Sequence, residues 1–451
     1  MSKAFDTVNI HILMHKILIY TTIPNLIIKF LNNYLKGRQS YTTFNNTQSN
    51  KNNIKTGVPQ GGVLSPTLFN IYTHDLPTPT QNNTSTSYAD DITAANTQTD
   101  INKAKQEIET YLTAIHQWTL KNQLQLNETK TTATLMTPDP AQYNKQLNIN
   151  INNTTLPTNK HPKILGLTFD PKLTYNIHIH NTISKARKSL NILKALTSTT
   201  WGKQKETILN TYKTITRPIL EYGCTIWGPI ISPTLMQKLQ TIQNTALRIA
   251  TGNTQDTNIQ HLHEETRTIP LDIHIKMLTS QYRAQTLQSN HPLNHLHNNI
   301  TTTRNKKITI FKNNNYTTDI SPPEQEINST IKQLHTHFVT EYINTLTHNK
   351  IINQIAPSIH HSETTLDRQT RRTLAQLRTN KSPLLRSYLH KIQPDITTTD
   401  TCPLCRQHPH DTTHLFNCTQ IHTHLVPIDL WQRPVEVADL LATWRREMGA
   451  P

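Results

Sequence analysis

The sequence has 451 residues and a formal net charge of +16 at pH 7, because 45 lysines and arginines face only 29 acidic residues. This excess suits a polyanion such as nucleic acid, although a basic protein without that role, or one drawn to anionic membranes, would have the same composition. No apolar run reaches the roughly 18 residues of a membrane-spanning helix, the first residues lack a secretory signature, and four cysteines are too few for a disulfide scaffold, so we expect an intracellular protein without a membrane span.

The first part of the chain alternates amphipathic helical patterns with polar turns. In chain order we expect a helix over 11–20, a helix over 24–35, a β-branched strand segment over 40–44, a polar loop to 55, a glycine- and proline-rich loop over 57–66 and a helix over 67–76. Residues 84–94 then predict a β-hairpin in which two strands flank a tight turn at Asp90 and Asp91.

Helical patterns dominate the remainder of the chain. Thr99 or Asp100 can cap a helix whose apolar residues share one face as far as Trp118. Beyond it we expect an apolar strand segment over 164–169, helices over 178–196, 203–220, 324–346 and 367–392, a boundary near 252–263 and a linker rich in Asn, Thr and Lys over 294–323.

Tyr88-Ala89-Asp90-Asp91 is the sharpest short motif in the sequence. Two adjacent carboxylates at a turn repel each other, so the arrangement is costly unless a cation lies between them. Nucleotidyl transfer with two metal ions needs such oxygen ligands. Alone the motif is weak, because paired aspartates are common in exposed turns.

Four further blocks accompany this motif in a defined order. They are Ser2 to Val8, the loop Gly57 to Pro66, the segment Leu124 to Thr131 after Trp118, and Ile164 to Phe169. The five blocks together resemble the palm motifs of reverse transcriptases, in particular those of jockey-like non-LTR retrotransposons. The stretches 217–228 and 239–252 are similar to the thumb of that family, and within them we expect Tyr222 and Trp227 to pack in a core.

This resemblance implies an RNA-directed DNA polymerase that copies element RNA into DNA at a primed target site by two-metal nucleotidyl transfer. It implies an α/β polymerase palm with an antiparallel sheet and packed helices over 1–175, an α-helical thumb over 176–252, a connector and linker over 253–323, and an α-rich C-terminal region with a zinc knuckle over 324–451. Element RNA, target DNA and deoxynucleoside triphosphates would be the partners, in the nucleus and cytoplasm.

The resemblance also implies roles for single residues. Asp90 and Asp91 would bind Mg²⁺, and Lys130 would lie near the pyrophosphate as a general acid. The nucleotide- and template-binding residues would be Phe5, Gln60, Gly61, Gly62 and Tyr88. Glycines let a strand approach the backbone closely, and a glutamine both donates and accepts hydrogen bonds. For Phe5, a core position at the edge of a palm strand is an equally good interpretation.

The start of the sequence departs from the family pattern. In the family the first motif reads Asp, an apolar residue, then Ser-Lys-Ala-Phe-Asp, and the leading aspartate is the third metal ligand. Met1 fills the apolar position, so that aspartate would precede it. We expect the chain alone to be impaired, since losing a bridging carboxylate lowers rates by on the order of a thousandfold. A non-enzymatic nucleic-acid-binding remnant is the alternative, and a group II intron maturase or telomerase-like relative is a weaker one.

Three cysteines and a histidine near the C-terminus have the spacing of a zinc site. Cys402, Cys405, His414 and Cys418 could bind zinc tetrahedrally, and the cluster resembles the knuckle downstream of the polymerase in this family. Three unrelated thiols beside a surface histidine are the alternative. Other histidines that could supply the fourth ligand are His408, His410, His422 and His424.

A basic helical arm precedes the cysteine cluster. Its cationic residues are Arg368, Arg371, Arg372, Arg378, Lys381, Arg386 and Lys391. We expect either a solvated charged face or, because the knuckle adjoins it, a surface that contacts phosphates.

Overall fold

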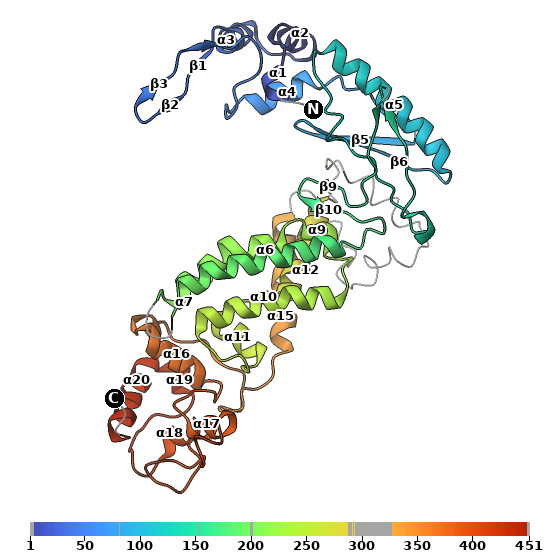
Figure 1. Ribbon diagram of the computed structural model, residues 1–451. Coiled ribbons are helices and arrows are strands. Elements are labelled where there is room, and N and C mark those ends of the chain that lie inside the picture. Colours follow the sequence, from blue (N-terminus) through green and yellow to red (C-terminus); the bar gives the residue numbers. More distant parts are fainter. Residues whose placement is uncertain are drawn as a thin grey trace. The chain divides into compact units, whose positions relative to one another are not determined.

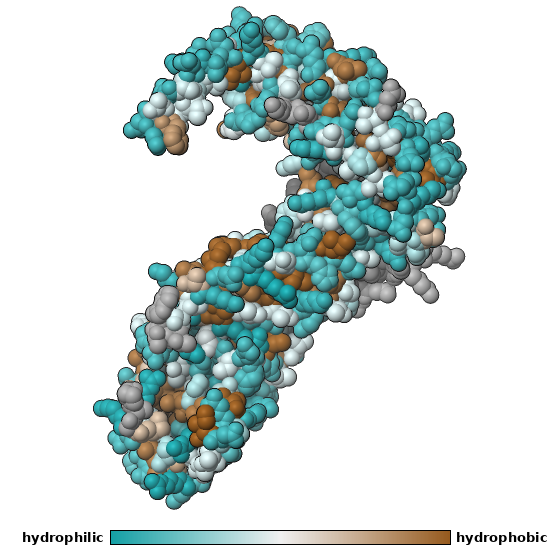
Figure 2. Space-filling view, in the orientation of Figure 1, coloured by the Kyte–Doolittle hydropathy of each residue, from teal (hydrophilic) through white to brown (hydrophobic). Residues whose placement is uncertain are grey.

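The structure is a computed structural model that describes residues 4–80, 82–152, 154–198, 202–286, 291, 293 and 327–448. It divides into two compact units, Met1–Ile164 with Asp170–Leu173, and Leu165–Phe169 with Thr174–Pro451. Figure 1 shows the elements of both units, and Figure 2 shows a mainly hydrophilic surface on the side in view. The predicted linker over 294–323 and the first residues of the Ser2 to Val8 block lie outside the described residues. No helix among the described residues is both long and apolar enough to cross a membrane.

The helices of the first unit surround one hydrophobic core. They are α1 (Ala4–Thr7), α2 (Ile10–Tyr20), α3 (Asn25–Leu35), α4 (Ser65–Tyr72) and α5 (Ile101–Lys121), with a short 3-10 turn at Pro140–Gln142. The predicted helices over 11–20 and 24–35 are confirmed. Asn9 begins α2 by accepting hydrogen bonds from the amides of His11 and Ile12, which otherwise lack partners in the first helical turn. The core includes Leu13, Ile17, Leu35, Phe69 and Trp118.

The strands of the first unit form separate antiparallel pairs. These are β1 (Gln39–Ser40) with β4 (Asn52–Asn53), β2 (Thr43–Phe44) with β3 (Thr47–Gln48), β5 (Asn83–Tyr88) with β6 (Asp91–Asn96), and β7 (Asn150–Ile151) with β8 (Thr154–Thr155). Antiparallel pairing was expected, but the described residues show two-stranded sheets rather than one wider sheet. Most of these strands are polar and exposed, so they offer no apolar face against which a wider sheet could pack.

The second unit begins as a bundle of helices. They are α6 (Asn176–Ala195), α7 (Lys205–Thr211), a π-helical segment (Tyr212–Thr216), α8 (Arg217–Glu221), α9 (Cys224–Trp227), α10 (Pro233–Thr251), α11 (Ile259–Thr266), α12 (Leu271–Thr286) and α15 (Ile327–Asn344). The helix predicted over 203–220 is interrupted, because Pro218 has no amide hydrogen for the helical ladder and the turn before it widens. Leu262 and Leu271 belong to the same core as the earlier helices, so that core continues past residue 252, and the division there stays a prediction.

The C-terminal part of this unit has its own hydrophobic core. Its elements are a 3-10 helix (His361–Thr365), α16 (Arg368–Leu377), α17 (Arg386–Ile392), α18 (His414–Asn417), α19 (Asp429–Gln432) and α20 (Pro434–Glu447). One helix was predicted over 367–392, but a loop containing Asn380 in the left-handed region (φ 57°) and Pro383 separates α16 from α17. Trp444 of α20 and Leu374 of α16 are completely buried in this core.

Candidate active site and zinc cluster

The paired aspartates lie at the tip of the β5–β6 hairpin. Tyr88 pairs with Asp91, so Ala89 and Asp90 form the two-residue turn, and Ala89 takes the left-handed conformation (φ 51°) that such turns need. The predicted hairpin is therefore confirmed, but its turn lies one residue earlier than the predicted turn at Asp90 and Asp91. Asp90 is half-buried, whereas Asp91 and Tyr88 are exposed, and the tip presents two neighbouring carboxylates.

Helix α5 fixes the base of this hairpin through Glu107. The Glu107 carboxylate accepts hydrogen bonds from the side chains of Asn96 at 2.8 Å, Gln98 at 2.9 Å and Asn82 at 3.3 Å. These bonds, led by those from Asn96 and Gln98, lower the pKa of Glu107. Asp100 caps the same helix by accepting from the amide of Asn102, as predicted. The two aspartates thus lie at the tip of a hairpin whose base is hydrogen-bonded to α5.

The glycine-rich loop lies against the first residues of the chain. The amide of Gly57 donates to the carbonyl of Val8, and the amide of Val58 donates to that of Phe5, both at 2.8 Å. A Cβ on Gly57 would lie 2.7 Å from the carbonyl oxygen of Asp6, so only glycine fits this approach. The structure therefore brings together the first and second of the five sequence blocks.

Gln60 adds a side-chain link between these blocks. Its Nε2 donates to Oδ1 of Asp6 at 2.9 Å, on the exposed side of the loop. Gly61 has a φ of +82°, and a Cβ on Gly62 would lie 2.8 Å from the hydroxyls of Ser65 and Tyr34. The predicted nucleotide- and template-binding residues of this loop thus follow one another on a tight backbone turn.

Phe5 belongs to helix α1 and not to a strand edge. Its ring is half-buried and stacks on that of Phe69 in α4, with centroids 4.7 Å apart and planes 18° from parallel. This stacking favours the core interpretation over a contact with a nucleotide. The contact also attaches the first residues of the chain to the helix that follows the glycine-rich loop.

Lys130 lies in an exposed turn after α5. Its amide donates to the side chain of Asn127 at 3.1 Å. The lysine ammonium forms no hydrogen bond or ion pair with the residues that the structure describes. Its catalytic role stays a prediction.

A buried lysine of the first unit was not predicted from the sequence. Lys16 of α2 donates to Asp75 at 2.5 Å and to the carbonyl of Tyr72 at 2.6 Å, and the indole of Trp118 donates to the same Asp75 carboxylate at 3.0 Å. Burial lowers the pKa of Lys16, while Asp75 opposes that shift. The network ties α2, α4 and α5 together.

The last of the five blocks forms a hairpin rather than one strand. β9 (Lys163–Ile164) and β10 (Leu167–Thr168) flank a turn at Leu165 and Gly166, both with positive φ. In the second unit, the Tyr222 hydroxyl donates to the Leu165 carbonyl at 2.7 Å, and a Cβ on Gly166 would lie 3.0 Å from the Tyr222 ring. The prediction that Tyr222 packs in a core is wrong, because its side chain is 56% exposed; Trp227 is fully buried, as predicted.

The four predicted zinc ligands come together. The ligand atoms of Cys402, Cys405, His414 and Cys418 all lie within 4.8 Å of one another. The sulfurs of Cys402 and Cys418 are 4.0 Å apart, and the Cys405 sulfur is 3.3 Å from Nε2 of His414. Ligands of a tetrahedral zinc are separated by about 3.5–3.8 Å, so this donor set fits the ion. His414 is the histidine that completes the group, and the interpretation as unrelated thiols loses its support.

The protein holds these ligands in a tight turn and in a core. The amide of Cys402 donates to the carbonyl of His408 at 2.8 Å, and the amide of Arg406 donates to the carbonyl of Cys402 at 2.9 Å. Burial raises the pKa of Cys402 to about 11. Burial also opposes ionisation of Cys405, but hydrogen bonds from the backbone of Gln407 and His408 outweigh it and lower the pKa.

The basic arm is neither a solvated face nor a phosphate surface over most of its length. Arg378 is almost fully buried; it donates to both oxygens of Glu265 at 3.0 and 3.1 Å and to the Glu363 carboxylate. Arg371 forms an ion pair with Glu206 at 2.5 Å. Both expectations are wrong for these residues, because Arg378 and Arg371 are themselves buried and are paired with carboxylates: the buried Glu265 and Glu363, and the exposed Glu206. Lys391 and Arg386 remain exposed.

The other arginines of the arm bind backbone oxygens at the end of α10. Arg368 donates to the carbonyl of Ile249 at 3.0 Å, and Arg372 donates to that of Gly252 at 3.2 Å. Carbonyls at the C-terminal end of a helix lack helical partners and carry partial negative charge. The arm therefore packs α16 against the helical bundle.

Comparison with known proteins shows what the first part of the chain is similar to. The model of the family "Reverse transcriptase (RNA-dependent DNA polymerase)" matches residues 1–169. The chain is 28% identical over 240 residues, 51% of its length, to the probable RNA-directed DNA polymerase from transposon X-element of Drosophila melanogaster, and 29% identical over 265 residues, 56% of its length, to that from transposon BS of the same species. It is 27% identical over 264 residues, 55% of its length, to the RNA-directed DNA polymerase from mobile element jockey of Drosophila melanogaster.

These matches cover 25%, 28% and 27% of the relatives, so the chain corresponds to about a quarter of their length. The family model begins at residue 1 and ends at Phe169, and it therefore contains the Ser2 to Val8 block, the glycine-rich loop, the aspartate hairpin and the β9–β10 turn. The order of blocks predicted from the sequence and the family match agree. Over residues 1–169 the chain matches the reverse transcriptase family, and it is similar to the RNA-directed DNA polymerases of jockey and related transposons.

Proposed function

We propose that this chain provides the catalytic aspartates of an RNA-directed DNA polymerase that copies the RNA of a transposable element into DNA. The observation that supports this most strongly is the β5–β6 hairpin, whose tip carries Asp90 and Asp91 side by side within a segment matched by the reverse transcriptase family. Its substrates would be element RNA, a target DNA primer and deoxynucleoside triphosphates. The protein would act inside the cell, in the nucleus and cytoplasm.

Asp90 and Asp91 would hold Mg²⁺. Carboxylate oxygens are the ligands that this hard cation prefers, and an adjacent pair at an accessible turn suits such ions. The bound cations would supply activation of the primer hydroxyl and neutralisation of the triphosphate charge. The contribution of the protein is to keep the two carboxylates at the tip of the hairpin. The hydrogen bonds that Glu107 accepts from Asn96 and Gln98 hold the base of that hairpin.

The glycine-rich loop would position the nucleotide and the template strand. Gly61 exposes backbone where a strand can approach closely, Gly62 lets the loop pack against Ser65 and Tyr34, and Gln60 is oriented by its bond to Asp6. Tyr88 is exposed beside the aspartates and could contact the same substrates. We include Phe5 as a residue that supports the loop through Phe69, and Lys130 as the proton donor to pyrophosphate.

The second unit would serve as thumb and nucleic-acid-handling region. We propose a palm over 1–175, a thumb over 176–252, a connector and linker over 253–323 and an α-rich region over 324–451 with zinc bound by Cys402, Cys405, His414 and Cys418. The preformed geometry of those ligands supports zinc as a structural ion.

Primer extension tests the proposal. The chain and a version carrying an aspartate directly before Met1 are each given an RNA template, an annealed DNA primer, deoxynucleotides and Mg²⁺. We expect extension that needs the divalent cation, that is stronger with the added aspartate, and that Asp91→Asn abolishes. Asp100→Asn serves as a control, because it changes an exposed carboxylate at a helix start outside the proposed site. If neither version extends the primer, the polymerase assignment is overturned.

A further inference from the structure

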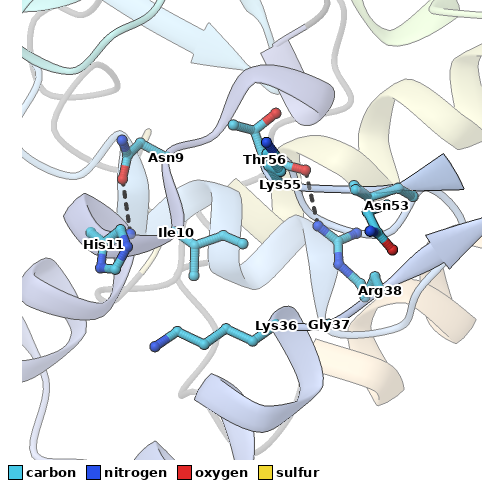
Figure 3. A pocket seen from close by; sticks show the side chains of 10 residues that line it. Asn9, Ile10, His11, Lys36, Gly37, Arg38, Asn53, Lys55 and Thr56 are labelled. Atoms are coloured by element: carbon cyan, nitrogen blue, oxygen red, sulfur yellow. Dashed lines mark hydrogen bonds between the residues drawn. The ribbon is translucent and has the colours of Figure 1, made fainter.

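A polar cavity lies at the base of the exposed ribbon formed by β1, β4, β2 and β3. Its volume is about 320 Å³. The lining residues come from the start of α2, the end of α3 and the base of the ribbon, and they include Asn9, Lys36, Arg38, Lys55 and Thr56. Figure 3 shows the residues of the α2 start facing those of the ribbon base across the cavity. None of the residues that line this cavity belongs to the sequence blocks of the proposed polymerase site.

The cavity has a strongly cationic surrounding. No aspartate or glutamate occurs between residues 7 and 74, whereas this stretch contains six lysines and arginines. Lys16 is the member of this set that the structure buries against a carboxylate, Asp75. The lining itself offers Lys36, Arg38 and Lys55, and no acidic side chain. An anion that enters the cavity therefore meets positive potential without a competing carboxylate in the lining.

The charge available to a ligand comes chiefly from two lysines. The Arg38 guanidinium already donates to the carbonyls of Leu35 and Thr56, each at 3.0 Å, and to that of Gly57. The side chains of Lys36 and Lys55 are exposed, and neither has a hydrogen bond or ion pair within the part of the chain that the structure describes. The first amides of α2 are not the donors, because Asn9 already accepts from them.

The ribbon above the cavity favours a polymer over a small anion. All its residues from Gln39 to Asn53 are exposed, and the aromatic side chains Tyr41 and Phe44 are 50% and 76% exposed. Aromatic rings in water beside a basic surface are the arrangement on which unpaired bases stack while lysines contact the backbone. Binding of a free phosphate would not involve these rings.

We propose that the cavity binds a backbone phosphate of single-stranded nucleic acid, with Lys36 and Lys55 as the contacting cations and the ribbon aromatics as a stacking surface for adjacent bases. This inference rests on the proposed function only in taking nucleic acid as the ligand. It assigns binding to a surface that lies outside the aspartate hairpin, and it needs neither nucleotide nor divalent cation.

The test measures how tightly the full chain binds a labelled oligouridine. Fluorescence anisotropy reports the binding, without divalent cation or nucleotides. The variant combines Lys36→Gln with Lys55→Gln, and the matched control combines Lys29→Gln with Lys121→Gln, two exposed lysines of the same unit outside the cavity. We expect roughly fivefold or greater loss of affinity in the cavity variant, and a salt dependence whose slope falls by about 0.7 for each phosphate contact removed. The control should stay near the parent.

Three further measurements make the result decisive. Thermal unfolding of both double variants should match the parent, since all four lysines are exposed. Equal affinities of the cavity and control variants would overturn the proposal. A second result would also overturn it: the cavity variant loses the thermal shift induced by inorganic phosphate but keeps its affinity for RNA. The cavity would then be a small-anion site. Asp91→Asn should bind RNA normally, which separates this inference from failure of the polymerase assignment.

Discussion

Tyr222 donates its hydroxyl hydrogen to the carbonyl oxygen of Leu165 at 2.7 Å across 57 residues of sequence. The ring covers Gly166, and a Cβ on the neighbouring Gly223 would lie 2.6 Å from the Leu167 side chain. These contacts join the β9–β10 turn to the segment between α8 and α9 within the second unit. The turn is thereby held by a tyrosine that is itself largely exposed.

Removing this hydroxyl should weaken the second unit measurably. We expect Tyr222→Phe to lower the free energy of unfolding by about 0.5–1.5 kcal/mol, the usual net value of one hydrogen bond. Gly166→Ala should cost more, because it adds a crowded Cβ at a φ of +87°. Denaturant unfolding measures both. Tyr282→Phe, at another partly exposed tyrosine, is the control and should change little.

The buried charge centre around Arg378 predicts a larger effect. Arg378→Leu would leave Glu265 and Glu363 buried with one cation fewer, and such losses cost about 3–5 kcal/mol. Arg386→Leu removes an exposed arginine eight positions later and should lower the unfolding free energy by less than about 0.5 kcal/mol. An Arg378→Leu chain as stable as the parent would show that these ion pairs contribute nothing.

The same centre predicts a sign for the dependence of stability on pH. Burial alone would raise the pKa of Glu363, but Arg378 and Lys205 outweigh it and hold that pKa well below its ordinary value. A carboxyl with a depressed pKa in the folded state contributes stability that is complete above its unfolded pKa of about 4.3 and is lost as the pH falls below it. Unfolding free energies measured between pH 7 and pH 3 should decrease on acidification. A flat profile in the parent would contradict this prediction.

Zinc should be bound in one equivalent and should support the C-terminal core. Cys402 and Cys418 are at once proposed ligands and buried members of that core, so a strong chelator should expose Trp444 and shift its fluorescence to longer wavelength. Cys402→Ser should lose the metal, as measured by atomic emission. Cys224→Ser changes a buried cysteine of the other helical core and should retain one equivalent. A chelator that leaves the Trp444 fluorescence unchanged would argue against a structural ion.

Features carried by short stretches of sequence were predictable. The hairpin follows from residues 84–94 alone, although its turn was expected one residue later, and the zinc ligands follow from spacing within one turn and the helix after it. In both cases the interacting residues are near neighbours in the chain, so a local pattern contains the information. The paired strands of the first unit are also local, although the sequence did not indicate that they would stay two-stranded.

Features that depend on distant partners were not predictable. Arg371 and Arg378 occupy a basic run that resembles a solvated face, and the local pattern does not show that Glu363 and the distant Glu265 are buried beside them and neutralise them. The burial of Lys16 is unpredictable for the same reason, since its partner Asp75 lies 59 residues away. The sequence predicts Tyr222 in a core because aromatic residues usually bury area, whereas in the structure one hydrogen bond positions its side chain at the surface.

The charge centre has a consequence for the order in which the chain can fold. Arg378 follows Glu265 by 113 residues, and Arg371 follows Glu206 by 165. During synthesis the helices that carry these glutamates leave the ribosome first, and the Glu265 carboxylate cannot be buried at low cost until α16 has been made. Contacts that close such long loops form slowly. The helical bundle should therefore reach its final packing only after α16 emerges, and a nascent chain stopped before residue 367 should remain unusually sensitive to protease around α7 and α11.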